Sequence, residues 1–362
     1  MVPAAVDEDA EASSSTFPLL MQRESPMVLR KVVTSWSDSS FLQHLDAQNL
    51  RTTWRLHPLG VSTVWESDCR FLEASVRHFL EWEGSTEPLS PSNPFAPYER
   101  QTHWAYADYK HLKELEDDWA EALEPLIDWS ALGCEKSATD STLWLGTGGS
   151  HTPLHYDTYG VNLVAQLHGR KKWLLYPPSA TASLSPTRVP YEESSVFSQV
   201  DARSPDIRRF PRYAEAHPLA VTLEPGDVLF VPKHWWHFVE AAETSLSVNV
   251  WVDAPGDSED RAKESVARVL MTSLASGLDA EVGPGWLNPT EGEAWPLEET
   301  LAVARLAFQG LDASADEADG DGQGGEARVP TGDAFSVRAM VDAVTAPDIL
   351  QMIASRISQR KG

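Results

Sequence analysis

Two side chains that can bind a metal ion lie close together in the segment HTPLHYDTYG, which places His155 and Asp157 two residues apart. In an extended chain, residues i and i+2 point to the same face, so one imidazole and one carboxylate can bind a single ion. A second imidazole is available in the segment KHWWHF, where His237 follows Asp157 by 80 residues. Two histidines and one carboxylate leave three positions of an octahedron open, which is the arrangement of non-haem Fe(II) oxygenases. The spacing therefore predicts an iron site.

Each of these features also has an ordinary structural explanation. An H-x-D triplet occurs by chance in many proteins, and a single histidine in a Trp-rich strand is usually a core residue. The two features together, in one strand-rich region, favour a metal site. Three further histidines lie nearby, and loop positions or positions behind the ligands suit them better than ligation. They are His151, His168 and His234.

An iron oxygenase with three open positions needs a co-substrate that fills two of them. The ketone and adjacent carboxylate of 2-oxoglutarate do this and leave one position for dioxygen. Its distal carboxylate requires a cation and a hydroxyl or amide group in an otherwise apolar pocket. Candidates near the triad are Thr152, Asn162, Lys171 and Asn249. On the residues alone Lys171 is more typical of a surface lysine, because Arg170 and Lys172 flank it.

The elements that must position these residues are short strands. Between residues 141 and 253, Pro and Gly separate the apolar runs STLWLG, VNLVAQLHG, KKWLLYPP, AVTLEPGDVLFVP and SLSVNVWVD. Such spacing without alternating helices indicates an antiparallel sandwich or barrel. Pro225-Gly226-Asp227 predicts a turn. In the last run, Ser247, Asn249 and Trp251 alternate with apolar residues, as expected of a barrel whose inner face holds a ligand.

The flanking segments predict helices and unstructured regions. Residues 1–24 are acidic and Ser-rich, which predicts a disordered tail. Within 25–140 we expect a strand at 27–29, a helix over RFLEASVRHFLEWE (70–83), a strand at 103–109 and a helix over KHLKELEDDW (110–119).

The C-terminal part is expected to be helical on both sides of a linker. Residues 257–312 predict helices, one with Ala262, Val266, Val269 and Leu270 on one face and one over 298–309. Residues 313–333 are an acidic, Gly-rich sequence that predicts a disordered linker. A last helix within 334–362 should open at Pro347. We expect it to bury Ile349, Leu350, Ile353 and Ile357.

Net charge, cysteine content and hydrophobicity disfavour several classes of protein. The 362 residues include 54 Asp and Glu against 29 Lys and Arg, a net charge of −25 that disfavours nonspecific nucleic-acid binding. Cys69 and Cys134 form neither a disulfide framework nor a zinc pattern, which fits a reducing compartment. No signal peptide is evident, and no apolar run approaches the roughly 20 residues that span a bilayer. We therefore expect a cytoplasmic protein.

From Ser141 to Val252 the chain resembles the jumonji-C (JmjC) family of 2-oxoglutarate oxygenases. The resemblance is carried by STLWLGTGGSHTPLHYD, NLVAQLHGRKKWLLYPP, SQVDARSPDIRRFPRY and LEPGDVLFVPKHWWHFVE. These segments are most similar to the subgroup that includes the asparaginyl hydroxylase of the hypoxia response and a protein associated with a small heat-shock protein. Weaker similarity covers FLEASVRHFLEW, HWAYADYKHL and WLNPTE.

The resemblance implies a mainly β protein with flanking helices. Its core would be a double-stranded β-helix of the cupin or jelly-roll type over 141–256, in an oxygenase domain of 25–256. The C-terminal helices could support a homodimer. His155, Asp157 and His237 would bind Fe(II). The residues implied to contact the 2-oxoglutarate co-substrate are Thr152 and Lys171 at its distal carboxylate, with Asn162, Asn249, Trp251 and Tyr106 around it.

The implied activity is hydroxylation of a protein side chain, with dioxygen as oxidant and a small heat-shock protein as a partner. N-methyl-lysine demethylation and a role as an adaptor with little catalysis remain alternatives. One departure affects the substrate, because the asparaginyl hydroxylase holds its target with an Arg-Gln pair just before the SQVD motif. Here Val196 and Phe197 stand at those positions. We therefore do not expect a shared asparagine substrate.

Overall fold

The computed structural model describes residues 4–9, 13–36, 41–47, 50–115, 119, 123–278, 286–291, 295–319 and 336–359. The chain divides into two compact units. The first comprises residues 1–254 and 285–292, and the second comprises residues 255–284 and 293–362. No helix in the described ranges is both long and apolar enough to cross a bilayer.

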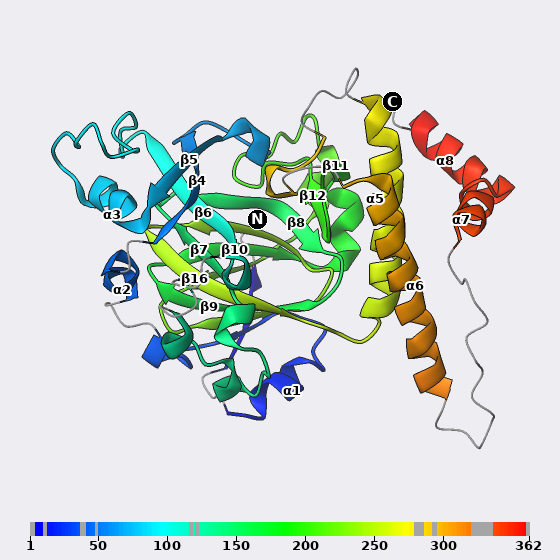
Figure 1. Ribbon diagram of the computed structural model, residues 1–362, viewed down its shortest axis with the longest axis horizontal. Coiled ribbons are helices and arrows are strands. Elements are labelled where there is room, and N and C mark those ends of the chain that lie inside the picture. Colours follow the sequence, from blue (N-terminus) through cyan, green and yellow to red (C-terminus); the bar gives the residue numbers. More distant parts are fainter. Residues whose placement is uncertain are drawn as a thin grey trace. The chain divides into compact units, whose positions relative to one another are not determined.

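Two β-sheets form the first unit (Figure 1). In the described residues, the first sheet has seven strands in the spatial order β1 (Ala4–Ala5), β13 (Leu219–Leu223), β10 (Lys171–Tyr176), β15 (Trp236–Ala241), β8 (His151–Asp157), β12 (Ser195–Ser198) and β11 (Pro186–Glu192). The second has nine strands in the order β2 (Asp7–Asp9), β3 (Met27–Leu29), β14 (Val228–Val231), β9 (Val161–His168), β16 (Ser245–Val252), β7 (Thr142–Gly146), β6 (His103–His111), β4 (Arg51–Pro58) and β5 (Arg70–Ser75).

In two stretches of the core, consecutive strands alternate between the two sheets. β8 and β10 belong to the seven-stranded sheet and β9 to the other, and the alternation repeats over β13, β14, β15 and β16. This winding is that of a double-stranded β-helix. The predicted fold class, a β-helix core with flanking helices, is confirmed.

The side-chain alternation of β16 separates two environments. Leu246, Val248 and Val250 are fully buried in the largest hydrophobic core, which also contains Trp54 and Phe79. Ser247 and Asn249 are also buried, but they point to the opposite face of the strand. The predicted turn between β13 and β14 places Gly226 at a φ of 90°, a conformation that favours glycine.

The N-terminal region differs from expectation in three places. The tail predicted to be disordered contains α1 (Thr16–Leu20), which buries Phe17 and Leu20, and β1 and β2 pair with strands of the two sheets. The helix predicted over 70–83 is shorter, because 70–75 form β5 and only α3 (Val76–Gly84) is helical. Of the helix predicted over 110–119, Lys110 and His111 instead end β6, Leu112–Glu114 form a 3-10 turn, and among the remaining described residues only Trp119 is helical. α2 (Phe41–Ala47) precedes β4.

The start of α3 has a local cause. The Ser75 hydroxyl accepts a hydrogen bond from the backbone N–H of His78, so Ser75 is the N-cap of the helix. A capping serine adopts an extended backbone, which is compatible with the end of a strand. The apolar residues Phe71 and Leu72 therefore lie before the helix.

The second unit is helical. α5 (Asp257–Leu278) and α6 (Leu297–Asp319) pack with Val269 and Ala304 between them, and Arg268 stacks on Trp295 at 3.8 Å. α6 covers the first part of the predicted linker, whose remainder at 320–333 lies outside the described residues.

Two shorter helices, α7 (Val337–Val344) and α8 (Pro347–Gln359), follow. α8 opens at Pro347 as predicted. Leu350 and Ile353 were expected to be buried, but they are 49% and 43% exposed. Leu270 on α5, expected on the buried face, is 37% exposed.

Candidate metal centre

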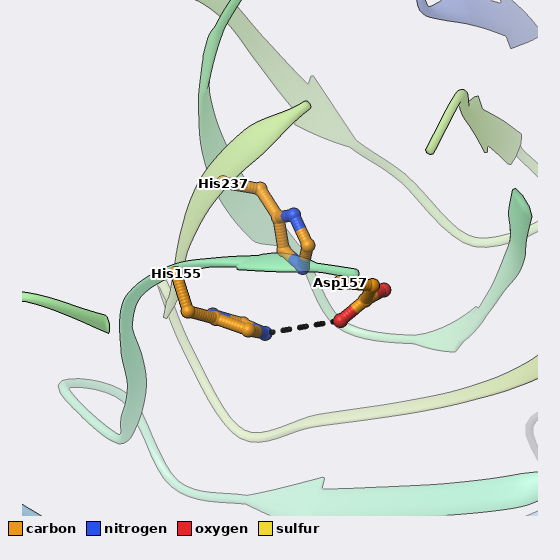
Figure 2. Close-up of side chains that lie close together, drawn as sticks. All are labelled: His155, Asp157 and His237. Carbon is orange, nitrogen blue, oxygen red and sulfur yellow. Dashed lines mark ion pairs between the residues drawn. The ribbon is translucent and has the colours of Figure 1, made fainter. Parts of the chain in front are cut away.

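The three predicted ligands come together on two neighbouring strands. β8 carries His155 and Asp157, and β15 pairs antiparallel with β8 so that His237 lies directly opposite His155. Opposed residues on paired strands present their side chains on the same face of the sheet. One potential ligand atom from each residue lies within 4.8 Å of the other two. Figure 2 shows the three side chains pointing toward one another. Within the described part of the chain, this is the one such group of His, Cys, Asp or Glu.

Hydrogen bonds set which nitrogen of each histidine faces the centre. His155 Nδ1 lies 2.8 Å from the carbonyl oxygen of Pro153, and His237 Nδ1 lies 3.0 Å from that of Trp235. A carbonyl can only accept, so each Nδ1 carries the proton and each Nε2 offers a lone pair. His155 Nε2 is 3.8 Å from Asp157 Oδ1. Both histidines are thus oriented for metal binding.

Burial also keeps His155 in the neutral form that ligates metals. Desolvation, with a smaller contribution from His237, lowers the pKa of His155 to about 4. Asp157 opposes this shift without cancelling it. Neutral imidazole is therefore the form of His155 near neutral pH.

The competing histidines do not join the group. His151 Nδ1 lies 3.1 Å from the Gly149 carbonyl oxygen, and its ring packs edge-on against Trp104. His234 Nε2 lies 2.8 Å from the Thr158 carbonyl oxygen. Neither of them, nor His168, belongs to the cluster of potential ligands.

Lys171 is buried with hydroxyl groups as its partners. Its side chain is 2% exposed, and Nζ donates to Ser247 Oγ at 2.7 Å and to the Tyr106 hydroxyl at 3.4 Å. Tyr106 is also hydrogen-bonded to Thr152. None of the ion pairs found among the described residues includes Lys171, and burial lowers its pKa to about 7. A buried ammonium group with only neutral partners fits an anionic ligand, because a bound carboxylate would supply the missing charge.

The remaining predicted contacts form a second network. Asn249 Nδ2 donates to Asn162 Oδ1 at 2.8 Å, and the Trp144 indole N–H donates to Asn249 Oδ1 at 2.7 Å. The indole N–H of Trp251 donates to Asp157 Oδ2 at 3.0 Å. Trp251, expected to line the co-substrate cavity, therefore contacts one of the three predicted metal ligands.

Trp173 is a further polar group beside the centre. It lies on the same face of β10 as Lys171, and its ring centroid is 5.9 Å from that of His237. Its indole N–H is buried and has no hydrogen-bond partner among the described residues. A buried donor without a partner is costly, so a ligand atom that accepts from it would stabilise the protein.

The wall next to His155 is apolar. Phe197 lies opposite His155 in the register of β12 and β8, and the two ring centroids are 6.0 Å apart. Trp65 packs edge-on against Phe197, and Val196 is opposite Tyr156. Val196 and Phe197 stand where the asparaginyl hydroxylase has the Arg-Gln pair that holds its target. Neither side chain can form a hydrogen bond.

Two residues near the centre, Trp144 and Trp173, were not singled out from the sequence. Ser247 was expected on the polar inner face of β16, but its contact with Lys171 was not. Trp144 and Trp173 carried no such signal, since tryptophans in strands are usually core residues. The structure reveals their roles, because the indole N–H of Trp144 donates to Asn249 and that of Trp173 has no partner among the described residues.

Comparison with known proteins agrees with this geometry. Residues 70–258 match the family model of the cupin-like domain. Human HSPB1-associated protein 1 is 39% identical over 304 residues, which cover 82% of this chain and 61% of the relative. The Danio rerio homolog is 39% identical over 293 residues, covering 79% and 65%. Lysine-specific demethylase 8 of Danio rerio is 40% identical over 236 residues, covering 63% and 53%. The chain thus spans less than two thirds of the length of these relatives, and it belongs to the cupin-like family of the JmjC type.

Proposed function

We propose that this protein is an Fe(II)- and 2-oxoglutarate-dependent dioxygenase that hydroxylates a protein side chain. The observation that carries the proposal is a buried lysine that makes no ion pair within the described part of the chain, on the inner face of the β-helix that also bears the His-Asp-His group. A metal site alone would suit several reactions. A metal site with a separate carboxylate-binding cation suits a co-substrate that carries both a chelating end and a distant acid.

Each group has a distinct task in this proposal. His155, Asp157 and His237 would hold Fe(II), which with dioxygen and 2-oxoglutarate supplies the oxidising power for C–H hydroxylation. The Lys171 ammonium and the hydroxyls of Ser247 and Tyr106 would bind the distal carboxylate and orient the co-substrate. The apolar residues that surround these groups exclude water, which strengthens the electrostatic attraction between Lys171 and the carboxylate.

The proposed target is a side chain that does not require an amide clamp. Phe197 gives the wall beside His155 an apolar surface, whereas Val196 lies on the other face of β12 and packs with Leu154 and Trp236. A buried asparagine or aspartate held against Phe197 would lose its hydrogen bonds there. We propose a small heat-shock protein as a partner, because relatives of this chain are named for association with HSPB1. We also propose a cytoplasmic location, which suits the two free cysteines, and a homodimer through the C-terminal helices.

Co-substrate turnover tests the proposal directly. The purified full chain, loaded with Fe(II) and given 2-oxoglutarate and oxygen, should release succinate slowly even without a protein substrate. His155→Ala should abolish this release, whereas His168→Ala, a histidine outside the metal group, should not. Absence of succinate from the wild-type protein under all metal conditions would reject the oxygenase proposal.

The same preparation separates the competing functions. Incubation with a purified small heat-shock protein, followed by mass spectrometry, should show the gain of an oxygen atom. Loss of a methyl group from a methylated lysine would instead identify a demethylase, the activity named for more distant relatives. Binding of the heat-shock protein that is unchanged by His155→Ala, with no turnover in the wild type, would identify an adaptor.

A further inference from the structure

The two oxygens of the Asp157 carboxylate have different surroundings. Oδ1 faces the histidines and lies 3.8 Å from His155 Nε2. Oδ2 accepts the indole N–H of Trp251 at 3.0 Å. Asp157 is 9% exposed, so few water molecules can reach Oδ2 and replace the hydrogen bond from Trp251. The N–H of Trp251 therefore holds one oxygen of the acid away from the position where the three ligands meet.

The number of oxygens that Asp157 gives to a metal decides how many positions remain open. With one oxygen, the three residues occupy three of six octahedral positions. With both oxygens they occupy four, and only two positions remain. A co-substrate that binds through two atoms needs two positions and dioxygen needs another, so binding through both oxygens of Asp157 would leave the site one position short.

We propose that Trp251 is a positioning residue that restricts Asp157 to binding the metal through a single oxygen. This inference rests on the proposed function, since it assumes a metal at the His-Asp-His group. Trp251 lies on β16, two residues beyond Asn249 and on the same face as Ser247, the partner of Lys171. One strand thus orients both the acid that binds the metal and the lysine that would bind the co-substrate.

Substitutions at Trp251 test the role through the bound metal. Trp251→Phe removes the N–H and keeps an aromatic ring. Trp251→His keeps a five-membered ring whose Nε2–H takes the place of the indole N–H. Co(II) serves as the probe because its visible spectrum reports coordination number. We expect Trp251→Phe to weaken Co(II) binding by about tenfold or more and to change the spectrum. Trp251→His should restore most of both, and Trp295→Phe in the second unit should change neither.

A measurement on the wild-type fold covers the case in which Trp251→Phe does not fold. The indole N–H signal of Trp251, assigned in NMR spectra through Trp251→His, should exchange slowly with deuterium and shift when Zn(II) is added. A Trp251→Phe protein with unchanged Co(II) affinity and spectrum, or a fast-exchanging indole signal that Zn(II) does not move, would overturn the positioning role while leaving the oxygenase proposal intact. Failure of the wild-type protein to bind Co(II) or Fe(II) would reject both.

Discussion

At the scale of single residues, Lys171 offers the sharpest test because its neighbour is a natural control. Lys171 is buried and Lys172 is exposed, although both lie on β10. We predict that Lys171→Met weakens 2-oxoglutarate binding to the Mn(II)-loaded protein by roughly 10- to 150-fold, the value of one buried charge-assisted hydrogen bond of about 1.5–3 kcal/mol. Lys172→Met should leave the affinity unchanged. Isothermal titration calorimetry measures both, and equal effects would contradict the assignment.

The titration of Lys171 gives a second prediction, for proton linkage. Burial lowers its pKa to about 7, so above that pH the free protein holds a neutral amine. A bound carboxylate favours the ammonium form, so binding must then take up a proton and should weaken as the pH rises above about 7, toward tenfold per unit. Calorimetry in two buffers with different ionisation enthalpies measures the uptake. Lys171→Arg stays charged and should show none, and a wild-type affinity that is flat up to about pH 9 would refute the linkage.

The grouping of the three candidate metal ligands could be predicted from the sequence, whereas the residues that contact them could not. His155, Asp157 and His237 carry their signal in residue type and spacing. The contacts of Trp251 with Asp157 and of Ser247 with Lys171 join residues 94 and 76 positions apart. Such contacts depend on which strands become neighbours, and strand pairing between distant segments leaves no periodic pattern in the chain.

At the scale of elements, a buried polar network links strands and loops of the first unit. Arg55 on β4 pairs with Asp108 at 2.5 Å and with Glu66 at 3.2 Å, so one guanidinium is shared by two carboxylates. Asn288, from the segment 286–291, donates to Glu66 at 3.2 Å and to Glu192 at 2.5 Å. Arg55 thus pairs with two buried carboxylates, and a third, Glu192, is joined to Glu66 only through Asn288. Buried carboxylates in excess over paired cations favour the protonated form.

This excess of acid predicts how stability depends on pH. Burial, opposed by Arg55, raises the pKa of Glu66 to about 7 from its ordinary value of 4.5. The contribution of protonated Glu66 to stability is therefore complete below about 4.5 and is lost as the pH rises through about 7. We predict that Glu66→Gln, which cannot ionise, reduces the loss of unfolding free energy between about pH 5 and pH 8 by at least about 1 kcal/mol.

Urea unfolding at a series of pH values measures this change. Glu87→Gln is the matched control, because Glu87 is exposed. A Glu66→Gln protein whose stability falls with pH as steeply as that of the wild type would show that Glu66 is ionised in the folded state throughout this range.

Element type could be read from the sequence where side-chain period was unambiguous. The alternation in β16 and the Pro-Gly turn between β13 and β14 are local and were predicted correctly. The segment 70–75 was assigned to a helix because its apolar residues continue the spacing of α3. Pairing with β4 and the Ser75 cap decided otherwise, and pairing with a distant strand is not visible in a local window.

At the scale of the whole molecule, α8 exposes apolar side chains that a monomer would leave in water. Leu350, Met352 and Ile353 are 49%, 51% and 43% exposed on this helix. Burying one such side chain contributes about 1.5–3 kcal/mol, and Leu350 and Ile353 lie three residues apart on one helix face.

We predict that the chain forms a homodimer through α8 and that Leu350→Glu with Ile353→Glu makes it monomeric. Gln351→Glu, which adds charge to an exposed polar position of the same helix, should leave the dimer intact. Sedimentation velocity measures the mass of each species, and a monomeric wild-type protein, or a dimer that survives both glutamates, would show that α8 is not the contact.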